Sequence, residues 1–532
     1  MAPPTRNELA RMSRAYFESL SPEALVDEAC GLHELAVHLT ERLDQNSTNS
    51  SRPPSSDSPF SRGARSDDEG PNAGSDPPAA QEKNGQAQGQ GAPAQDAGPT
   101  APAPSGEGAS DSSSKRGAGK QPGAKGSWRS EPLVATGSVP HYPPACETCS
   151  LPLAEGAGAR KHKAYYVLEL ERLSDGGFGM RVVCTLHEYY ALPCSCGHET
   201  RAMPGEGYVS TVEGRKNQLQ LKEEVLVGPH LASFLAALSV RYRMSRSKIQ
   251  EFLAYWMGTP LSPGTICRCV REAGVACFAV VEQLTKDLQE AKIIHLDETP
   301  WFEKKLQLWL WVAVSMYTVV FVIGTRKKEV LLELVSEAFL GWLVTDGYGA
   351  YRDRLRRQRC LAHLIRKAIA LAGAIGEKPK RFGEWLLREL RQLIHTVAEA
   401  GEEAKHKTPP ILARLKRACL LGAQEKDHSK LRALAREILA DWDAVVAFVK
   451  NPELSPTNND AERVLRHAVI SRGISFGTRT PEGSRAYAAL LSVIETCYRR
   501  GADPWAYIAQ TIALGRKGLA PLAIPLPVAL TA

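Results

Sequence analysis

Two kinds of hydrophobic spacing alternate along the chain. Near the N-terminus, apolar residues recur at steps of four and three, a heptad pattern that predicts a helix over 20–43. Three heptads are few for an isolated coiled coil, so self-association and packing against the same chain are both open. The apolar seam comprises Leu25, Ala29, Leu32, Ala36, Leu39 and Leu43.

The next stretch has no hydrophobic periodicity. Residues 47–140 are rich in Ser, Pro, Gly, Ala and Gln and contain almost no large apolar side chains. Such a segment cannot bury enough surface to offset the entropy of ordering it, so we expect a disordered linker. A short module with β-like segments and several cysteines follows at 141–203.

A helical pattern occupies residues 228–285. Three helices are expected here, with Ser245 and Ser262 as N-caps. A helix, a short turn and a second helix can place the second helix in a DNA groove, with Arg268 and Arg271 exposed on it. The alternative is a plain packing unit of three helices.

Strands and helices alternate after residue 290. The apolar run Leu306–Gly324 is long enough for a membrane span, but polar residues interrupt it, and two buried strands joined by a turn explain it better. A helix is expected over 327–339, followed by an apolar strand that ends at Asp346, and the pattern is helical over 361–450.

Composition and charge narrow the function classes only slightly. The chain has 532 residues, which suggests three or four domains. A net charge of +7 is compatible with nucleic-acid binding. The first residues contain no apolar signal segment, so the 12 cysteines favour reduced thiols or a metal site over a secreted disulfide scaffold.

Four cysteines in the module at 141–203 have the spacing of a metal site. Two thiolate pairs brought together by a small β unit match tetrahedral zinc, and zinc would supply folding energy that so small a core lacks. His187 and His198 are possible substitute ligands, and unliganded thiols are the alternative. The pairs are Cys146-x-x-Cys149 and Cys194-x-Cys196.

Three acids point to a divalent cation. Asp297 and Asp346 each end an apolar strand, where an unpaired carboxylate is costly and two neighbouring carboxylates repel each other. Magnesium would resolve both costs. A strand, a meander, a helix and a second strand with an acid follow the ribonuclease-H-like order, in which a later helix supplies the third carboxylate, here Glu462. Arg463 and Arg466 on that helix are candidate phosphate contacts.

Several motifs in one order resemble a known family. They include "HLDETPW", "TDGYGAY", "CLAHLIRK", "TNNDAERVLRHAVISRG" and "GADPWAYI". With these motifs the chain resembles bacterial transposases of insertion-sequence family sixty-six, which have a ribonuclease-H-like Asp-Asp-Glu core. The CxC pair is a departure, because that family more often has CxxC at this place.

The resemblance implies a multidomain α+β protein and metal-dependent DNA transposition. Asp297, Asp346 and Glu462 would hold two Mg²⁺ or Mn²⁺ ions, and one structural zinc would lie in the cysteine module. Partners would be the terminal inverted repeats of the element, target DNA, further copies of the chain and accessory proteins of the element, in the bacterial cytoplasm at the nucleoid and not in a membrane. The expected division is 1–46 (zipper-like helix), 47–140 (linker), 141–203 (zinc module), 228–285 (helical DNA-binding domain), 290–500 (catalytic core with a helical insertion at 361–450) and 501–532 (C-terminal helix and tail).

Two further motifs can be interpreted either as structural or as functional. Cys360-x-x-His363 is either a core cysteine with a helix-capping histidine, or an accessory pair near the reacting phosphate or clasping the core. Arg479 and Arg485 lie beside glycines in a segment that could approach DNA phosphates. The competing functions are a nuclease of the same fold that cuts without joining, and a catalytically silent DNA-binding protein derived from a transposase.

Overall fold

The structure, a computed structural model, describes residues 16–17, 19–43, 133–156, 158–172, 179–209 and 219–526. Most of the predicted linker therefore lies outside the described residues. The helix expected near the N-terminus is present as α3 (Pro22–Leu43). The Leu25 side chain on its apolar seam is 42% exposed, and the coiled-coil hypothesis stays a prediction.

The cysteine-bearing module is built on a four-stranded sheet in which β3 is central. β1 runs parallel to β3, and β2 and β4 run antiparallel to it. β1 begins inside the segment predicted to be linker, because its sequence Gly-Ser-Val-Pro-His has the composition of a loop. A two-stranded sheet follows. The strands are β1 (Gly137–His141), β2 (Arg160–Arg172), β3 (Met180–Pro193), β4 (Glu199–Arg201), β5 (Glu206–Val209) and β6 (Gln220–Lys222).

The three helices expected between 228 and 285 are present, followed by a fourth. Ser245 and Ser262 cap the second and third helices as predicted, each accepting a backbone N–H in the first turn. The third helix is buried along its C-terminal half, where it packs against α17 (Pro481–Arg500). The elements are α4 (Pro229–Ala236), the π-helix η3 (Ala237–Arg241), α5 (Arg246–Met257), α6 (Pro263–Ala276) and α7 (Phe278–Gln289).

A mixed five-stranded sheet follows, in the order β11-β10-β7-β8-β9. The first three strands in sequence form an antiparallel meander, and the last two run parallel to the first. The apolar run at 306–324 forms two strands, as predicted, and no helix among the described residues is both long and apolar enough to cross a bilayer. The strands are β7 (Ile293–Glu303), β8 (Leu306–Val314), β9 (Val319–Gly324), β10 (Trp342–Thr345) and β11 (Arg357–Arg359).

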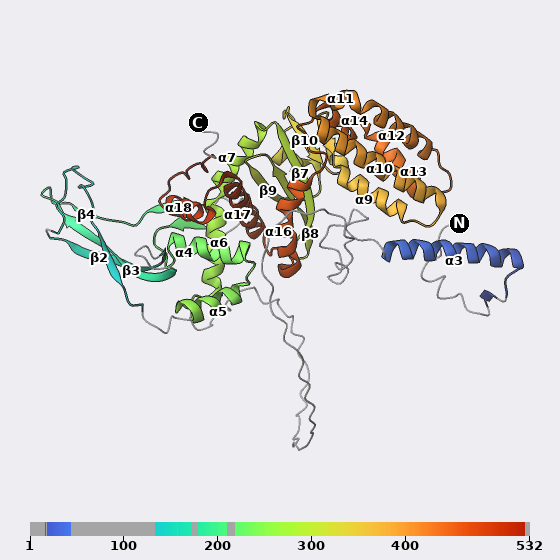
Figure 1. Cartoon of the computed structure of the whole chain (residues 1–532). Helices are drawn as coiled ribbons and strands as arrows, with labels where there is room; N and C mark the ends of the chain where they lie inside the picture. The colour runs from blue at the N-terminus through green and yellow to red at the C-terminus, as the bar shows by residue number, and fades with distance from the viewer. Residues whose placement is uncertain are drawn as a thin grey trace, which may run out of the picture. The chain divides into compact units, whose positions relative to one another are not determined.

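Helices cover this sheet (Figure 1). α16 (Asn459–Ser475) packs on β7 and β8, and α17 packs on β9. Ser492 and Thr496 of α17 accept backbone N–H groups of β9, so the edge strand has polar partners on its open side. The helix predicted over 327–339 is shorter, since α8 (Lys328–Leu334) ends where Val335 takes an extended conformation. The last helix is α18 (Pro504–Arg516).

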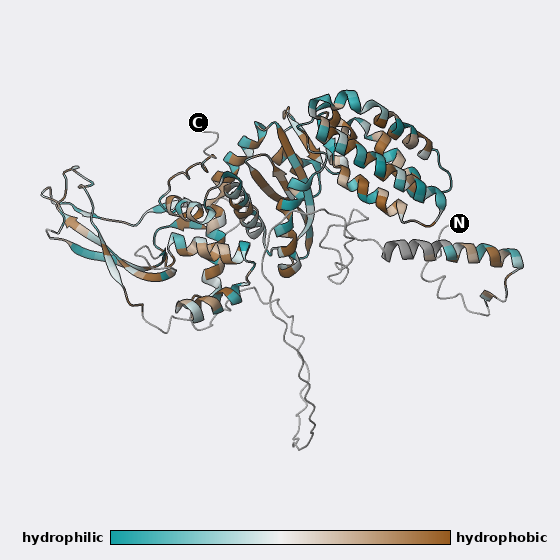
Figure 2. Ribbon diagram, viewed as in Figure 1, coloured by the Kyte–Doolittle hydropathy of each residue, from teal (hydrophilic) through white to brown (hydrophobic). Residues whose placement is uncertain are grey.

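The segment between β11 and α16 is helical, as predicted, and has its own hydrophobic core. Ion pairs from Arg357 to Asp441 and from Arg359 to Glu437 join it to the last strand of the sheet. Figure 2 shows hydrophobic residues along the strands of the sheet, and both hydrophobic and hydrophilic residues on these helices. The helices are α9 (Leu361–Ala372), α10 (Glu377–Ala400), α11 (Ala404–Lys407), α12 (Pro409–Gly422), α13 (Ser429–Ala440), α14 (Trp442–Val445) and α15 (Ala447–Lys450).

Candidate functional site

Asp297 lies in β7, which pairs with β8 on one side and, just before this residue, with β10 on the other. Burial raises the pKa of Asp297 well above its usual value, and the negative charges of Glu298, Asp346 and Glu462 raise it further. Two of these charges come from distant segments, directly after β10 and in the first turn of α16. The fold therefore brings the three predicted acids close enough for the charges of Asp346 and Glu462 to raise the pKa of Asp297.

Asp346 directly follows β10, at the end of the strand next to β7. Its Oδ1 accepts the backbone N–H of Tyr348 at 2.8 Å, which fixes the turn. The next residue, Gly347, packs so closely against the Arg359 guanidinium that a Cβ would overlap it. This contact explains a glycine at a position whose backbone needs no left-handed conformation.

Glu462 is positioned by Asn458, a fully buried residue at the start of α16. The Asn458 side-chain amide donates to the Leu296 carbonyl oxygen at 2.7 Å, and its backbone N–H donates to Cys360 Sγ at 3.1 Å. The amide oxygen lies 3.2 Å from His295 Nδ1. These contacts hold the first turn of the helix against β7 and the start of α9.

Glu298 is a buried acid that sequence reasoning missed. Its carboxylate accepts from Arg326 Nη2 at 2.7 Å and from the Tyr351 hydroxyl at 2.6 Å. Burial raises the pKa of Glu298 to about 7, with a further contribution from the charge of Asp346. The sequence signal was its place beside Asp297, which alone does not distinguish an active-site acid from one in a structural ion pair.

Cys360 and His363 lie close to Glu462. One ligand atom from each lies within 4.8 Å of the others, a spacing that the set Asp297, Asp346 and Glu462 does not reach. Glu462 Oε1 is 3.9 Å from His363 Nδ1 and 3.7 Å from Arg366 Nη2. Burial, with the charge of Arg366, lowers the pKa of His363 to about 3. The histidine is therefore neutral and has a lone pair for a ligand.

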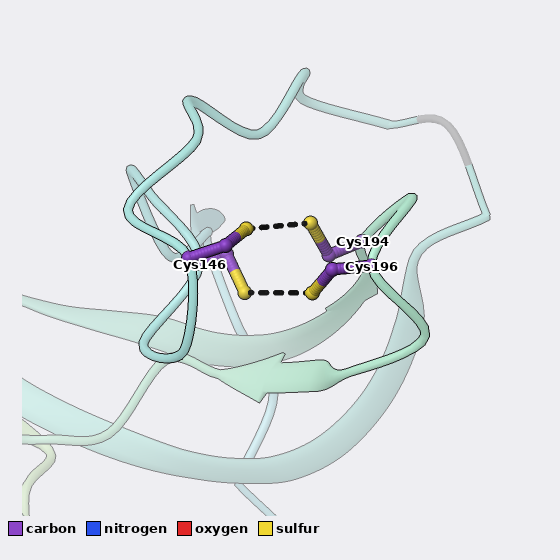
Figure 3. A group of neighbouring side chains, drawn as sticks. Cys146, Cys194 and Cys196 are labelled. Atoms are coloured by element: carbon purple, nitrogen blue, oxygen red, sulfur yellow. Dashed lines mark hydrogen bonds between the residues drawn. The ribbon is translucent and has the colours of Figure 1, made fainter.

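The four predicted cysteines form the second such group in the part of the chain that the structure describes. Figure 3 shows Cys146 facing the Cys194–Cys196 segment. The sulfur atoms of Cys146 and Cys196 are 3.7 Å apart, and those of Cys149 and Cys194 are 3.4 Å apart. The donor set is four soft thiols at mutual contact, so the cluster can hold a zinc ion.

The two histidines proposed as substitute ligands lie outside the four-cysteine group. His187 Nδ1 is 2.9 Å from His141 Nε2 in β1, and their rings stack. His198 Nε2 is 4.0 Å from Glu147 Oε2. His187 is thus engaged elsewhere, whereas His198 Nε2 is buried without a hydrogen-bond partner. The ligand group consists of the four sulfurs, and the fourth sulfur takes the place that the sequence left uncertain.

Backbone hydrogen bonds favour thiolates at two of the cysteines. The N–H of Cys149 lowers the pKa of Cys146 to about 6, and the N–H of Cys196 lowers the pKa of Cys194. The pKa values of Cys149 and Cys196 shift upward, because the neighbouring sulfurs outweigh the N–H groups of Leu151 and His198. Backbone N–H groups within the cluster therefore favour the thiolates that zinc binds.

The predicted DNA-contacting arginines are mostly exposed. The exposed side chains include Arg268 near the start of α6, and Arg463 and Arg466 on α16. Arg271 is half-buried, because the third helix of this unit faces the protein along its C-terminal half. Arg479 is exposed, and the exposed Arg485 lies over the Phe278 ring at 4.7 Å.

Among the described residues, the mixed α+β fold thus has two groups of side chains that could hold a metal ion, four cysteines in one and Cys360, His363 and Glu462 in the other, with acids beside the five-stranded sheet. The sequence model of the Transposase IS66 family matches residues 224–486, and this part of the chain belongs to that family. Residues 1–88 match a second sequence model, described as a family of unknown function (DUF6444).

Three relatives come from Sinorhizobium fredii (strain NBRC 101917 / NGR234). Uncharacterized protein y4jD is 26% identical over 249 residues, 42% of this chain and 48% of that protein. Uncharacterized protein y4jO is 28% identical over 136 residues, which are 25% of this chain and 42% of that protein. Uncharacterized protein y4qI is 23% identical over 303 residues, which are 49% of this chain and 55% of that protein. The chain spans about half the length of these curated relatives, and their names state no activity.

Proposed function

We propose that the chain is an Asp-Asp-Glu transposase that cleaves and joins insertion-sequence DNA, with Asp297, Asp346 and Glu462 as its catalytic acids. The observation that carries the proposal is the placement of the three acids: Asp297 lies in β7, Asp346 directly follows the neighbouring strand β10, and α16, which carries Glu462 in its first turn, packs on β7. Burial raises the pKa of Asp297, and the charges of Asp346 and Glu462 add to the shift. Acids that repel one another at a buried place are poorly suited to a structural role and well suited to a cation.

The sheet supports a ribonuclease-H-like core. Its order, with an antiparallel meander extended on the other side by two parallel strands, is the arrangement expected for 290–500. The helices between β11 and α16 would be the insertion at 361–450. The expected zipper-like helix at 1–46, linker at 47–140, zinc module at 141–203, DNA-binding domain at 228–285 and C-terminal segment at 501–532 complete the proposed division.

The residues present fit divalent magnesium or manganese. Carboxylates are hard oxygen ligands, and a cation would relieve the repulsion that raises the Asp297 pKa. When bound by these acids, two such ions would supply activation of the attacking oxygen and charge stabilisation at phosphorus. The acids differ in origin, two from adjacent strands and one from a helix.

Positively charged side chains would hold the DNA backbone. Arg463 and Arg466 project from the helix that carries Glu462, and their exposed guanidinium groups suit phosphate oxygens. Arg268, Arg271, Arg479 and Arg485 would add contacts elsewhere on the duplex. Such contacts position DNA without reading its sequence, so they account for binding and not for recognition of the element ends.

The four cysteines would hold one structural zinc that stabilises the module at 141–203. We also propose that the chain acts as an oligomer, because cutting and joining two element ends needs two sets of catalytic groups. Bacterial cytoplasm at the nucleoid is the corresponding location.

A purified end-cleavage assay tests the proposal. The Asp297→Asn variant should lose metal-dependent nicking of inverted-repeat DNA while it still binds that DNA, because the side chain keeps its shape and loses the ligand charge. Asp353→Asn is the matched control, since that acid is 72% exposed and paired with Lys328. Undiminished nicking by Asp297→Asn would remove the catalytic assignment.

A labelled 3′ end separates the competing functions. Transfer of the label to target DNA supports a transposase, whereas nicking without transfer supports a nuclease of the same fold. DNA binding without nicking in the unmodified chain, under both magnesium and manganese, would favour a silent DNA-binding protein.

A further inference from the structure

Two helix starts meet at a small group of ligating atoms beside the proposed active site. Cys360 precedes α9, His363 lies in its first turn, and Glu462 lies in the first turn of α16. The Asn458 N–H donates to Cys360 Sγ, and the Leu361 N–H donates to the Pro456 carbonyl oxygen at 2.8 Å. These hydrogen bonds hold the two helix starts together, so the three ligands are fixed relative to one another.

Three polar atoms at this place lack hydrogen bonds among the described residues: His363 Nδ1, Glu462 Oε1 and Arg366 Nε. The Arg366 Nε carries a hydrogen and cannot bind a metal, whereas the histidine nitrogen and the glutamate oxygen are possible ligands and lie 3.9 Å apart. Buried polar groups in folded proteins are nearly always satisfied, so two unsatisfied ligand atoms this close together call for an explanation. A metal ion between the two atoms would satisfy both.

The donor types select the metal. A sulfur, an imidazole nitrogen and a carboxylate oxygen make a mixed, fairly soft set, which binds zinc well and magnesium poorly. Three protein ligands leave a fourth tetrahedral position open, unlike the four-cysteine cluster, which is closed. The two groups of metal-ligating side chains found among the described residues therefore differ in kind.

We propose that Cys360, His363 and Glu462 form an inhibitory zinc site. The role of Glu462 as a catalytic acid rests on the proposed function, and the zinc site itself does not. Zinc bound here would hold the Glu462 carboxylate on the side of α9, and a carboxylate held there is withdrawn from the cation shared with Asp297 and Asp346. Zinc would thus switch off DNA cleavage by removing one acid.

Arg366 competes with the ion for the same oxygen. Its Nη2 is 3.7 Å from Glu462 Oε1, and its positive charge opposes a second cation there. Zinc must therefore displace this contact, which makes the site weaker than the four-cysteine site. Replacing Arg366 with methionine should tighten zinc binding, an effect opposite to that of every ligand substitution.

Metal binding is measured on the full chain, with the four-cysteine site filled by one zinc. Titration with cobalt should then give thiolate-to-cobalt charge-transfer absorption from a second site. This absorption should disappear in Cys360→Ser. In His363→Gln, the affinity of the second site for cobalt should fall about tenfold. Cys419→Ser is the matched control, because Cys419 is equally buried and belongs to neither ligand group.

The outcomes decide the site without any assay of catalysis. A second cobalt site that needs Cys360 and His363, and that tightens in Arg366→Met, supports the proposal. Absence of thiolate charge transfer in the unmodified chain, or the same spectrum in Cys360→Ser, would overturn it. If circular dichroism shows that Cys360→Ser does not fold, the cobalt affinity of His363→Gln decides whether the site exists.

Inhibition is measured separately. The zinc concentration that halves magnesium-dependent end cleavage should rise about tenfold in Cys360→Ser, relative to its own zinc-free rate, and should not change in Cys419→Ser. Unchanged inhibition in Cys360→Ser would overturn the inhibitory role. A chain that binds the second metal but never cleaves DNA would refute the proposed function and leave the metal site supported.

Discussion

The side-chain amide of Asn458 donates a hydrogen bond to the Leu296 carbonyl oxygen at 2.7 Å. Leu296 directly precedes Asp297, and Asn458 lies one helical turn before Glu462. One buried contact therefore sets the position of the helix that carries the third acid against the strand that carries the first. The backbone N–H of Asn458 donates a hydrogen bond to Cys360 Sγ, and this bond connects the same junction to the start of α9.

Replacing Asn458 with alanine should reduce DNA cleavage far more than DNA binding. Loss of the contact frees the start of α16, and a displacement of about 1 Å in a catalytic group costs on the order of 10²-fold in rate. The Leu296 carbonyl is left without its side-chain donor, which costs about 1–3 kcal/mol of stability. Single-turnover cleavage, DNA affinity and the unfolding midpoint measure the three effects.

Asn451→Ala is the control for that prediction. Asn451 also bonds the backbone with its side chain, accepting the Glu453 N–H at 3.3 Å, but in a half-buried turn away from the junction. It should change none of the three quantities appreciably. Cleavage by Asn458→Ala at the unmodified rate would mean that the junction does not position Glu462.

Glu298 makes the stability of the metal-free protein depend on pH. The pKa of Glu298 is raised, chiefly by burial, from 4.5 to about 7. The folded chain therefore holds this proton more tightly than the unfolded chain does, so the stabilisation is complete below pH 4.5 and is lost as pH rises through about 7. The full loss is on the order of 3 kcal/mol.

Urea unfolding at pH 5 and pH 8 in the presence of a chelator checks this prediction. The midpoint should be lower at pH 8, and Glu298→Gln should reduce the difference. The exposed Glu329→Gln serves as control. Magnesium should also reduce the difference, because a cation offsets the charge of Asp346. A midpoint in Glu298→Gln with the same pH dependence as the unmodified chain would contradict this account.

Local patterns in the sequence were sufficient for many elements. The two strands at 306–324, the caps at Ser245 and Ser262, and the helical segment after β11 are all present, because apolar runs and capping residues act over a few positions. Where the pattern is weak, prediction failed. β1 reads as a loop by composition, and α8 ends earlier than its apolar residues suggest.

The candidate site was only partly predictable for a different reason. An acid after an apolar strand is visible in the sequence, and Asp297 and Asp346 were found in this way. The contact between Asn458 and Leu296 joins residues 162 positions apart, and that between Glu298 and Tyr351 joins residues 53 positions apart. Pairings at such separations depend on strand order and helix packing, which local patterns do not encode.

Zinc in the four-cysteine cluster should be lost in acid. Zinc binds thiolates, so protons compete with it, and the pKa of Cys146 is lowered to about 6 by the N–H of Cys149. We expect zinc to be retained at neutral pH and released increasingly as the pH falls. A colorimetric zinc indicator follows the release. Cys194→Ser should release zinc at higher pH, and the exposed Cys267→Ser should behave as the unmodified chain.

Gly347 should not tolerate even one added methyl group. A Cβ there would overlap the Arg359 guanidinium, and this side chain cannot swing aside, because it is only 3% exposed and donates to Glu437 Oε1 at 2.6 Å. Either the buried ion pair or the backbone beside Asp346 must shift. Overpacking of this kind costs about 1–3 kcal/mol.

Gly347→Ala should therefore lower the unfolding midpoint and also reduce cleavage, because the shifted residue adjoins a proposed catalytic acid. Gly349→Ala is the matched control: it lies two residues further on and has no atom within 4 Å of its ideal Cβ. Equal stability and equal cleavage in the two variants would show that the Arg359 side chain relaxes without cost. A loss confined to Gly347→Ala would mean that close packing of the strand-end turn, and not glycine flexibility, holds Asp346 in place.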